Sequence, residues 1–197
     1  PTLTAPAALT AVCSIDEQTA YADYAAFTAA GGSAADNCAI DESTFTLLSE
    51  ESNGETCPEV ITRTYQIADL CGNIDTAVQV IIIHDTIAPS LTPPAGLSTL
   101  CSIEEVPAYT SLEAFISAGG DTADNCGIDP ASFILLSEES DGLSCPETIT
   151  RMWTYTDACG NSASVSQTIT VDDTTDPTAS DPAGINVECV ADVPAPD

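Results

Sequence analysis

Cysteine is the residue of this 197-residue chain whose spacing most clearly predicts chemistry. The chain holds nine cysteines, and eight of them form two sets of four that a shift of 88 residues superimposes. Cysteines held at fixed spacing in a repeated sequence predict disulfides and an oxidising compartment. Zinc is disfavoured, because no C-x-x-C pair exists and the chain has one histidine. The sets are Cys13, Cys38, Cys57 and Cys71, then Cys101, Cys126, Cys145 and Cys159, and Cys189 begins a third.

Carboxylates are the second group that could do chemistry. Thirty-one acidic residues stand against two arginines and no lysine, and the net charge is −29. Such a chain lacks the basic patch that nucleic acids require, and anionic lipid surfaces repel it. A membrane span needs about 18 consecutive apolar residues, and no run in the sequence is that long. We therefore expect neither nucleic acid as a partner nor direct membrane insertion, and a surface that stays soluble or collects divalent cations.

Aspartate and asparagine in turns are candidate calcium ligands, because calcium binds loop oxygens. They gather in the two cysteine-containing loops of each copy and at the joints between copies. The alternative is that these side chains bond to their own backbone, since no spaced calcium loop of the EF-hand kind is present. Calcium is the one candidate cofactor, and its candidate ligands are Asp36, Asn37, Asp69, Asn73, Asp85, Asp124, Asn125, Asp157, Asn161, Asp172 and Asp173.

The two arginines occupy equivalent positions, Arg63 and Arg151. We expect each to form a structural ion pair with a nearby glutamate, since a partly buried guanidinium suits a bidentate carboxylate. In the first copy the candidate partners are Glu50, Glu51 and Glu59. The alternative is that the arginines bind an acidic sugar.

No catalytic residues are predicted, and we do not expect an enzyme. Without lysine the chain cannot form a Schiff base. The single histidine, His84, has Asp172 as its counterpart, so a Ser–His–Asp triad could exist in one copy only. Paired acids for glycoside hydrolysis would need a cleft that a small sandwich seldom provides.

The elements that carry these residues are mostly strands. Apolar and polar residues alternate along residues 61–68, which predicts a half-buried antiparallel strand. Residues 21–30 and 109–118 have helical spacing and end at paired glycines, which predicts one short helix per copy. We therefore expect an all-β fold of tandem sandwich repeats, about 88 residues each, with boundaries at 1–85, 86–173 and 174–197. The proline-containing linkers are short, which favours a semi-rigid rod.

Two sequence patterns carry a family resemblance. The run Y-x-x-x-D-x-C-G-N, followed by an apolar strand and D-T-x-x-P, resembles the hyalin-repeat (HYR) family of immunoglobulin-like modules. The longer pattern CSI…AGG…DNC-x-ID…F-x-LLSEES-x-G-x-x-CPE-x-ITR is similar to repeats of gliding-motility surface adhesins of Bacteroidetes. The resemblance implies immunoglobulin-like β-sandwich repeats in an extracellular cell-surface filament that leaves the cell by the type IX secretion route.

Four cysteines per repeat allow three pairings. In an immunoglobulin-like sandwich the two cysteine-containing Asp/Asn loops lie at one end, so their cysteines should bond to each other, and the remaining two should meet at the other end. Cys189 would pair within a following repeat. The predicted bonds are therefore Cys13–Cys57, Cys38–Cys71, Cys101–Cys145 and Cys126–Cys159.

A short Asp-Thr motif resembles the O-glycosylation signal of secreted Bacteroidetes proteins. It occurs four times, once loosely, and predicts glycoprotein character. The candidate acceptors are Thr76, Thr86, Thr122 and Thr174.

The function predicted from these features is a structural repeat segment of a surface filament, a stalk for adhesion or gliding motility. Its partners would be neighbouring repeats, with surface polysaccharide or other filament subunits as further candidates. The alternative is a carbohydrate-binding module in which Trp153 or Tyr155 stacks on a sugar.

Overall fold

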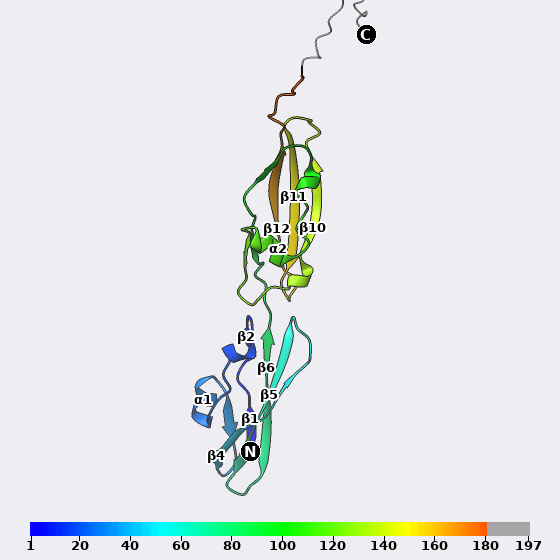
Figure 1. The fold of residues 1–197 in the computed structure, drawn as a ribbon. Helices are drawn as coiled ribbons and strands as arrows, with labels where there is room; N and C mark the ends of the chain where they lie inside the picture. The colour runs from blue at the N-terminus through cyan, green and yellow to red at the C-terminus, as the bar shows by residue number, and fades with distance from the viewer. Residues whose placement is uncertain (181–197) are drawn as a thin grey trace, which may run out of the picture.

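The computed structural model describes residues 1–180. The secondary structure repeats along the chain, and the two copies lie end to end with their long strands along a common direction (Figure 1). No helix among the described residues is both long and apolar enough to cross a membrane. The first repeat contains β1 (Thr2–Thr4), β2 (Leu9–Ala11), η1 (Ile15–Glu17), α1 (Tyr24–Ala29), β3 (Ser33–Ala35), β4 (Ile40–Ser52), β5 (Glu59–Asp69) and β6 (Ile74–Ile83).

The second repeat reproduces this order with one additional 3-10 turn, η3. Its elements are β7 (Ser90–Thr92), β8 (Leu97–Thr99), η2 (Ile103–Glu105), α2 (Leu112–Ser117), β9 (Asp121–Ala123), η3 (Pro130–Ser132), β10 (Ile134–Ser140), β11 (Glu147–Thr156) and β12 (Ser162–Val171).

Each repeat is an all-β, immunoglobulin-like sandwich. A four-stranded sheet of order β2-β6-β5-β4 faces the two-stranded sheet β1-β3, and the second repeat has β8-β12-β11-β10 and β7-β9. The short strand β2 runs parallel to β6, whereas β4, β5 and β6 pair antiparallel. The core of the first repeat joins Leu3 of β1, Phe27 of α1 and Tyr65 of β5, so the small sheet and the helix together cover the large sheet.

Strand β5 is the centre of the first sandwich, and its predicted alternation is confirmed. Ile61, Arg63, Tyr65 and Ile67 are buried and the three residues that alternate with them are half-buried, whereas Ala68, the last residue of the predicted pattern, is buried as well. Side chains of a strand alternate between its two faces, so these four point into the sandwich. Full burial of a large apolar side chain contributes roughly 1.5–3 kcal/mol.

The predicted short helix is present as α1. Asp23 caps its first turn, because its Oδ1 accepts a hydrogen bond from the Ala26 N–H at 2.8 Å. The helix ends before Gly31, which has φ +101°, and Gly32 lies against Phe27. A Cβ at Gly32 would be 2.3 Å from the Phe27 ring, so the second glycine is required by packing.

The opening segment contributes one short strand to each sheet of the sandwich. Strand β1 pairs with β3, and the chain then crosses to the other sheet, where Leu9 opens β2 beside β6. Pro6 lies between the two strands and has no N–H for a sheet ladder. Buried Gln79 holds the crossing segment, because its Nε2 donates to the Ala7 carbonyl at 3.0 Å.

Candidate functional site

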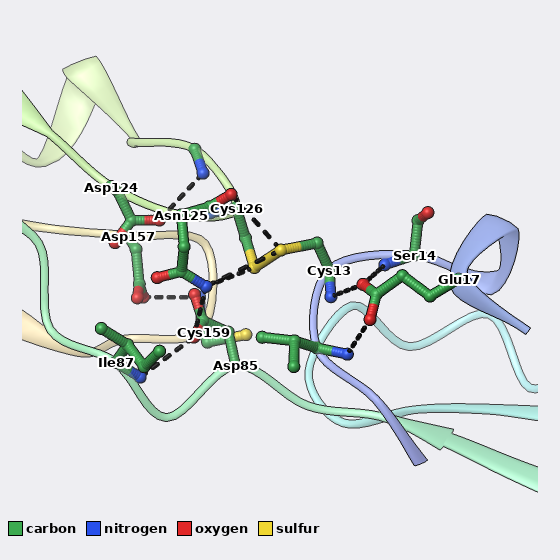
Figure 2. The surroundings of a disulfide bond; sticks show 12 residues. Cys13, Ser14, Glu17, Asp85, Ile87, Asp124, Asn125, Cys126, Asp157 and Cys159 are labelled. Carbon is green, nitrogen blue, oxygen red and sulfur yellow. Dashed lines mark hydrogen bonds between the residues drawn. A yellow bond between two sulfur atoms is a disulfide. The ribbon is translucent and has the colours of Figure 1, made fainter. Parts of the chain in front are cut away.

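The candidate site is the joint, where the loops holding Cys13 and Cys57 meet the loops holding Cys126 and Cys159 around residues 84–89. Two disulfides cross it. Cys13 is bonded to Cys126 with the Cα atoms 4.9 Å apart (Figure 2), and Cys57 to Cys159 with 5.1 Å. Together with the chain itself, three covalent connections therefore link the repeats.

This connectivity corrects the predicted one. Cys13–Cys57 and Cys126–Cys159 are wrong, because all four cysteines bond across the joint. Cys38–Cys71 and Cys101–Cys145 do not form either, and these four thiols are free and exposed. Cys189 lies outside the described residues.

The physical reason is that the loops of Cys13 and Cys57 meet the loops of Cys126 and Cys159 at the joint, so each cysteine finds its partner in the neighbouring repeat. Cys38 and Cys71 do line one hollow, as the loop argument requires. Their equivalents Cys126 and Cys159 nevertheless bond outward, to cysteines whose sequence separations are 113 and 102. In a tandem array an 88-residue shift converts a bond within a repeat into one between repeats, and spacing alone does not distinguish them.

Three aspartates converge beside the first disulfide. Asp85 follows β6, Asp124 follows β9 and Asp157 follows β11, and each contributes a carboxylate oxygen within 4.8 Å of the other two. Their side chains come together from three segments in Figure 2. Asp85 is 2% exposed and Asp157 4% exposed, whereas Asp124 is half-buried, so two of the three carboxylates are withdrawn from bulk water.

Asp85, at the end of the first repeat, is held by three residues of the second. Its Oδ1 accepts hydrogen bonds from the Ile87 N–H at 3.0 Å and from Asn125 Nδ2 at 3.1 Å. Its backbone carbonyl accepts one from Asn161 Nδ2 at 3.1 Å. Its Oδ2 is buried without a hydrogen-bond partner.

The other two carboxylates are oriented by their own turns. Asp124 Oδ2 accepts from the Cys126 and Gly127 N–H groups at 2.8 and 2.9 Å, while its buried Oδ1 has no partner. Asp157 Oδ1 accepts from the Cys159 N–H at 2.8 Å and the Asn161 N–H at 2.9 Å. Burial raises the pKa of the Asp157 carboxyl, but its bonds from Asn161 and Cys159 outweigh burial and hold the pKa below the ordinary 3.8.

Three ionised carboxylates at this distance repel one another. At an effective dielectric constant near 20, two unit charges 4.8 Å apart cost about 3 kcal/mol. Neither arginine relieves the repulsion. Arg63 Nε is 2.6 Å from Glu50 Oε2, and Arg151 Nε is 2.5 Å from Glu138 Oε2, so both are engaged in the ion pairs that the sequence predicts.

The equivalent end of the first repeat holds the candidate ligands Asp36, Asn37, Asp69 and Asn73, and these four residues line one hollow. Asp69 is bonded like Asp157, with its Oδ1 accepting from Cys71 and Asn73 at 2.8 and 2.9 Å. The bond from the Asn73 side chain is the main reason that the Asp69 pKa lies below its ordinary value. Asp36 Oδ2 lies 3.0 Å from the Pro1 ammonium group.

The remaining candidate ligands, Asp172 and Asp173, lie at the far end of the second repeat, away from the three-aspartate cluster. Asp172 Oδ1 is 3.3 Å from Cys145 Sγ. Asp173 Oδ1 accepts from the Thr175 N–H at 2.8 Å, which is the local backbone turn that the alternative interpretation describes.

Trp153 and Tyr155 are fully buried in the core of the second repeat, so neither presents a face on which a sugar could stack. Of the candidate glycosylation sites, Thr76, Thr86 and Thr174 are exposed. Thr122 is half-buried, and its hydroxyl is hydrogen-bonded to the Tyr155 hydroxyl.

One contributor to the joint was missed, the capping box that shapes the Cys13 loop. Ser14 caps η1, and Glu17 reaches back to the backbone. The Glu17 carboxylate accepts from the N–H groups of Val12 at 3.0 Å, Cys13 at 2.5 Å and Ser14 at 3.1 Å. The signal was readable, because S-x-x-E is the sequence pattern of a capping box.

Comparison with known families gives one assignment. Residues 90–171 match the family described as "HYR-like domain with 4 cysteines". No curated protein sequence matches the chain significantly. The match covers all six strands of the second repeat and its four cysteines. Each of these cysteines has an equivalent 88 residues earlier, in the first repeat. Residues 90–171 are therefore similar to the HYR-like domains with 4 cysteines.

Proposed function

We propose that the chain is a load-bearing stalk segment of an extracellular filament. The observation that supports this most strongly is the triple covalent connection at the joint, two disulfides beside the linker. A single short linker fixes a distance and leaves rotation free. Three attachment points that are not on one line also fix the orientation of one repeat relative to the next, so the stalk resists bending and torsion.

The same joint can be repeated in both directions. Cys38 and Cys71 are the equivalents of Cys126 and Cys159, and all of them belong to the Asp/Asn loops. Cys101 and Cys145 are the equivalents of Cys13 and Cys57. All four free thiols are exposed. We infer that each free pair bonds to a further repeat of the same kind, which extends the stalk.

Stretching a single molecule tests whether the disulfides carry load. In the oxidised chain the shortest covalent path crosses from Cys13 to Cys126, which removes a stretch of sequence separation 113 from the path. At about 3.3–3.6 Å per residue, about 400 Å of additional extension should appear after reduction. Equal extension with and without a reducing agent would contradict load-bearing by the bridges.

Disulfide mapping of native material, purified without reducing agent, tests the serial arrangement. Peptides containing Cys101 and Cys145 should be linked to peptides of a further repeat. A link between Cys38 and Cys71, or between Cys101 and Cys145, would show closed repeats and would contradict serial bridging.

The filament that we propose stands on the cell surface, leaves the cell by the type IX route, and serves adhesion or gliding motility. Support comes from the resemblance of the repeat to gliding adhesins, from disulfides that suit an oxidising exterior, and from the net charge of −29. Surface polysaccharide or other filament subunits would be its partners, and the exposed Thr76, Thr86 and Thr174 could carry glycans. Immunogold labelling of whole cells should mark thin filaments outside the envelope, and label confined to the cell interior would contradict the proposal.

A further inference from the structure

We propose that the joint binds one divalent cation, preferably Ca²⁺, between the carboxylates of Asp85, Asp124 and Asp157. Asp85 comes from the end of the first repeat, and Asp124 and Asp157 come from loops of the second. The site is therefore composite and exists only where two repeats meet.

The spacing of the three oxygen atoms suits calcium. Oxygen ligands lie 2.3–2.6 Å from Ca²⁺, so two ligands of one ion are at most about 5 Å apart. The three carboxylate oxygens lie within 4.8 Å of one another. The three oxygens are therefore close enough together to bind one Ca²⁺ ion.

The hydrogen bonding of the cluster independently points to a missing partner. Asp85 Oδ2 and Asp124 Oδ1 are both buried and both lack any hydrogen-bond partner. The Asp85 side chain belongs to a residue that is 2% exposed, so bulk water does not reach it freely. Buried carboxylate oxygens are normally paired or bound to a metal, because leaving them unpaired is costly.

The charge balance points the same way. The whole chain has two basic side chains other than histidine, and both are buried and paired with an exposed glutamate of the neighbouring strand. His84, the single histidine, is exposed and is not part of the cluster. No side chain of the described residues therefore neutralises these three carboxylates.

The ligand chemistry selects among divalent ions. All the atoms offered are oxygens, and the nearby cysteines are consumed by disulfides, which disfavours zinc. Asn125 supplies a fourth oxygen if its amide is turned, since the nitrogen that now faces Asp85 Oδ1 at 3.1 Å and the amide oxygen are nearly interchangeable in shape. Water completes the seven or so ligands of Ca²⁺, whereas Mg²⁺ demands a stricter octahedron.

Calorimetric titration with CaCl₂ tests the site directly. The oxidised chain is first freed of metal with EDTA, and wild type is compared with Asp85→Asn and with Glu139→Gln. Glu139 is exposed and distant in sequence from the cluster, so its replacement removes the same charge without touching the joint. We expect Asp85→Asn to weaken Ca²⁺ binding about tenfold or more, since ligand charge sets calcium affinity, and Glu139→Gln to leave it unchanged.

Two results would overturn the proposal. One is the absence of binding heat and of a Ca²⁺-dependent melting shift in wild type. The other is equal affinity in wild type and Asp85→Asn, which would assign the ion to another acidic surface. Asp124→Asn is a second variant in case Asp85→Asn does not fold, and its effect should be similar.

Anomalous scattering from wild-type crystals grown with Tb³⁺, an oxygen-binding substitute for Ca²⁺, locates the ion without any substitution. A peak between the three carboxylates supports the site, and peaks elsewhere alone contradict it. The disulfide experiments do not depend on the cation, so the stalk function and the cation site can fail separately.

Discussion

The joint and the open end of the first repeat contain equivalent loops, and they differ in whether a neighbouring repeat contacts those loops. In both, an aspartate of the D-x-C-G-N loop accepts a bond from its asparagine side chain at 2.7 Å. At the open end Cys38 and Cys71 are free. At the joint their equivalents are bonded to Cys13 and Cys57, and Asp85 is added from the other repeat.

Each repeat therefore folds its Asp/Asn loops without help from a neighbour, whereas the disulfides and the three-aspartate cluster require a second repeat. The turn geometry is present at the open end, where Asp69 accepts the same bonds from the N–H groups of Cys71 and Asn73. The disulfides and the third carboxylate appear only where the second body is present. A single excised repeat would therefore have the fold and lack the site.

The largest test of this difference removes one bridge with both of its cysteines, as Cys13→Ser with Cys126→Ser. A crosslink of sequence separation 113 restricts the unfolded chain, so its loss should lower the free energy of unfolding by about 4–5 kcal/mol. Urea denaturation of the oxidised proteins measures the change.

The matched control replaces the equivalent free cysteines, as Cys38→Ser with Cys101→Ser. These thiols are exposed and unbonded, so the change should stay within about 0.5 kcal/mol. Equal destabilisation in the two double variants would mean that the joint has no special role.

Much of the fold was predictable because it depends on short-range patterns. The alternation along β5 predicts its buried face, and the helical spacing with paired glycines predicts α1. The period of 88 residues made both patterns visible twice. The arginine ion pairs were predictable because a buried guanidinium on a strand needs an adjacent carboxylate, and glutamates are close to both arginines in the sequence.

The disulfides were not predictable because their partners are chosen by packing between repeats. Cys126 and Cys159 share one loop end, and no local pattern indicates that each bonds away from the other. The three-aspartate cluster was not predictable for the same reason. Asp85, Asp124 and Asp157 were three of eleven candidates, and only the meeting of two repeats separates them from Asp172 and Asp173. Composite sites depend on the relative placement of bodies, which residue spacing within one body does not encode.

A smaller test compares Asn161→Ala with Asn73→Ala. Asn161 Nδ2 donates both to Asp157 Oδ2 at 2.7 Å and across the joint to the Asp85 carbonyl at 3.1 Å. Asn73, which is exposed, makes only the equivalent bond within its own loop, to Asp69 Oδ2. Removing a donor from buried acceptors costs about 1–3 kcal/mol, so Asn161→Ala should destabilise more than Asn73→Ala, which should cost about 1 kcal/mol. Thermal unfolding measures both, and the reverse order would contradict a hydrogen-bonded joint.

The smallest expected effect concerns the loop that carries Cys13, and it is a dependence on pH. Bonds from the N–H groups of Val12, Cys13 and Ser14 lower the pKa of Glu17 below its ordinary 4.5. The ionised form is therefore favoured by folding, and its stabilisation is present above about pH 4.5 and is lost as the pH falls through the lower folded value. Wild type should melt at lower temperature as the pH falls below about 4.5, and Glu17→Gln should show a shallower decline.

Glu105→Gln provides the matched comparison, because the pKa of Glu105 is also lowered, chiefly by the Thr99 hydroxyl, and its loop carries the free Cys101. A disulfide tethers the Cys13 loop, whereas Cys101 has no disulfide partner among residues 1–180. Amide hydrogen exchange at neutral pH should therefore accelerate more around Cys101 in Glu105→Gln than around Cys13 in Glu17→Gln. If the two loops open equally, the bridge at the joint does not order the loop that bears it, and the rigidity of the stalk must come from packing instead.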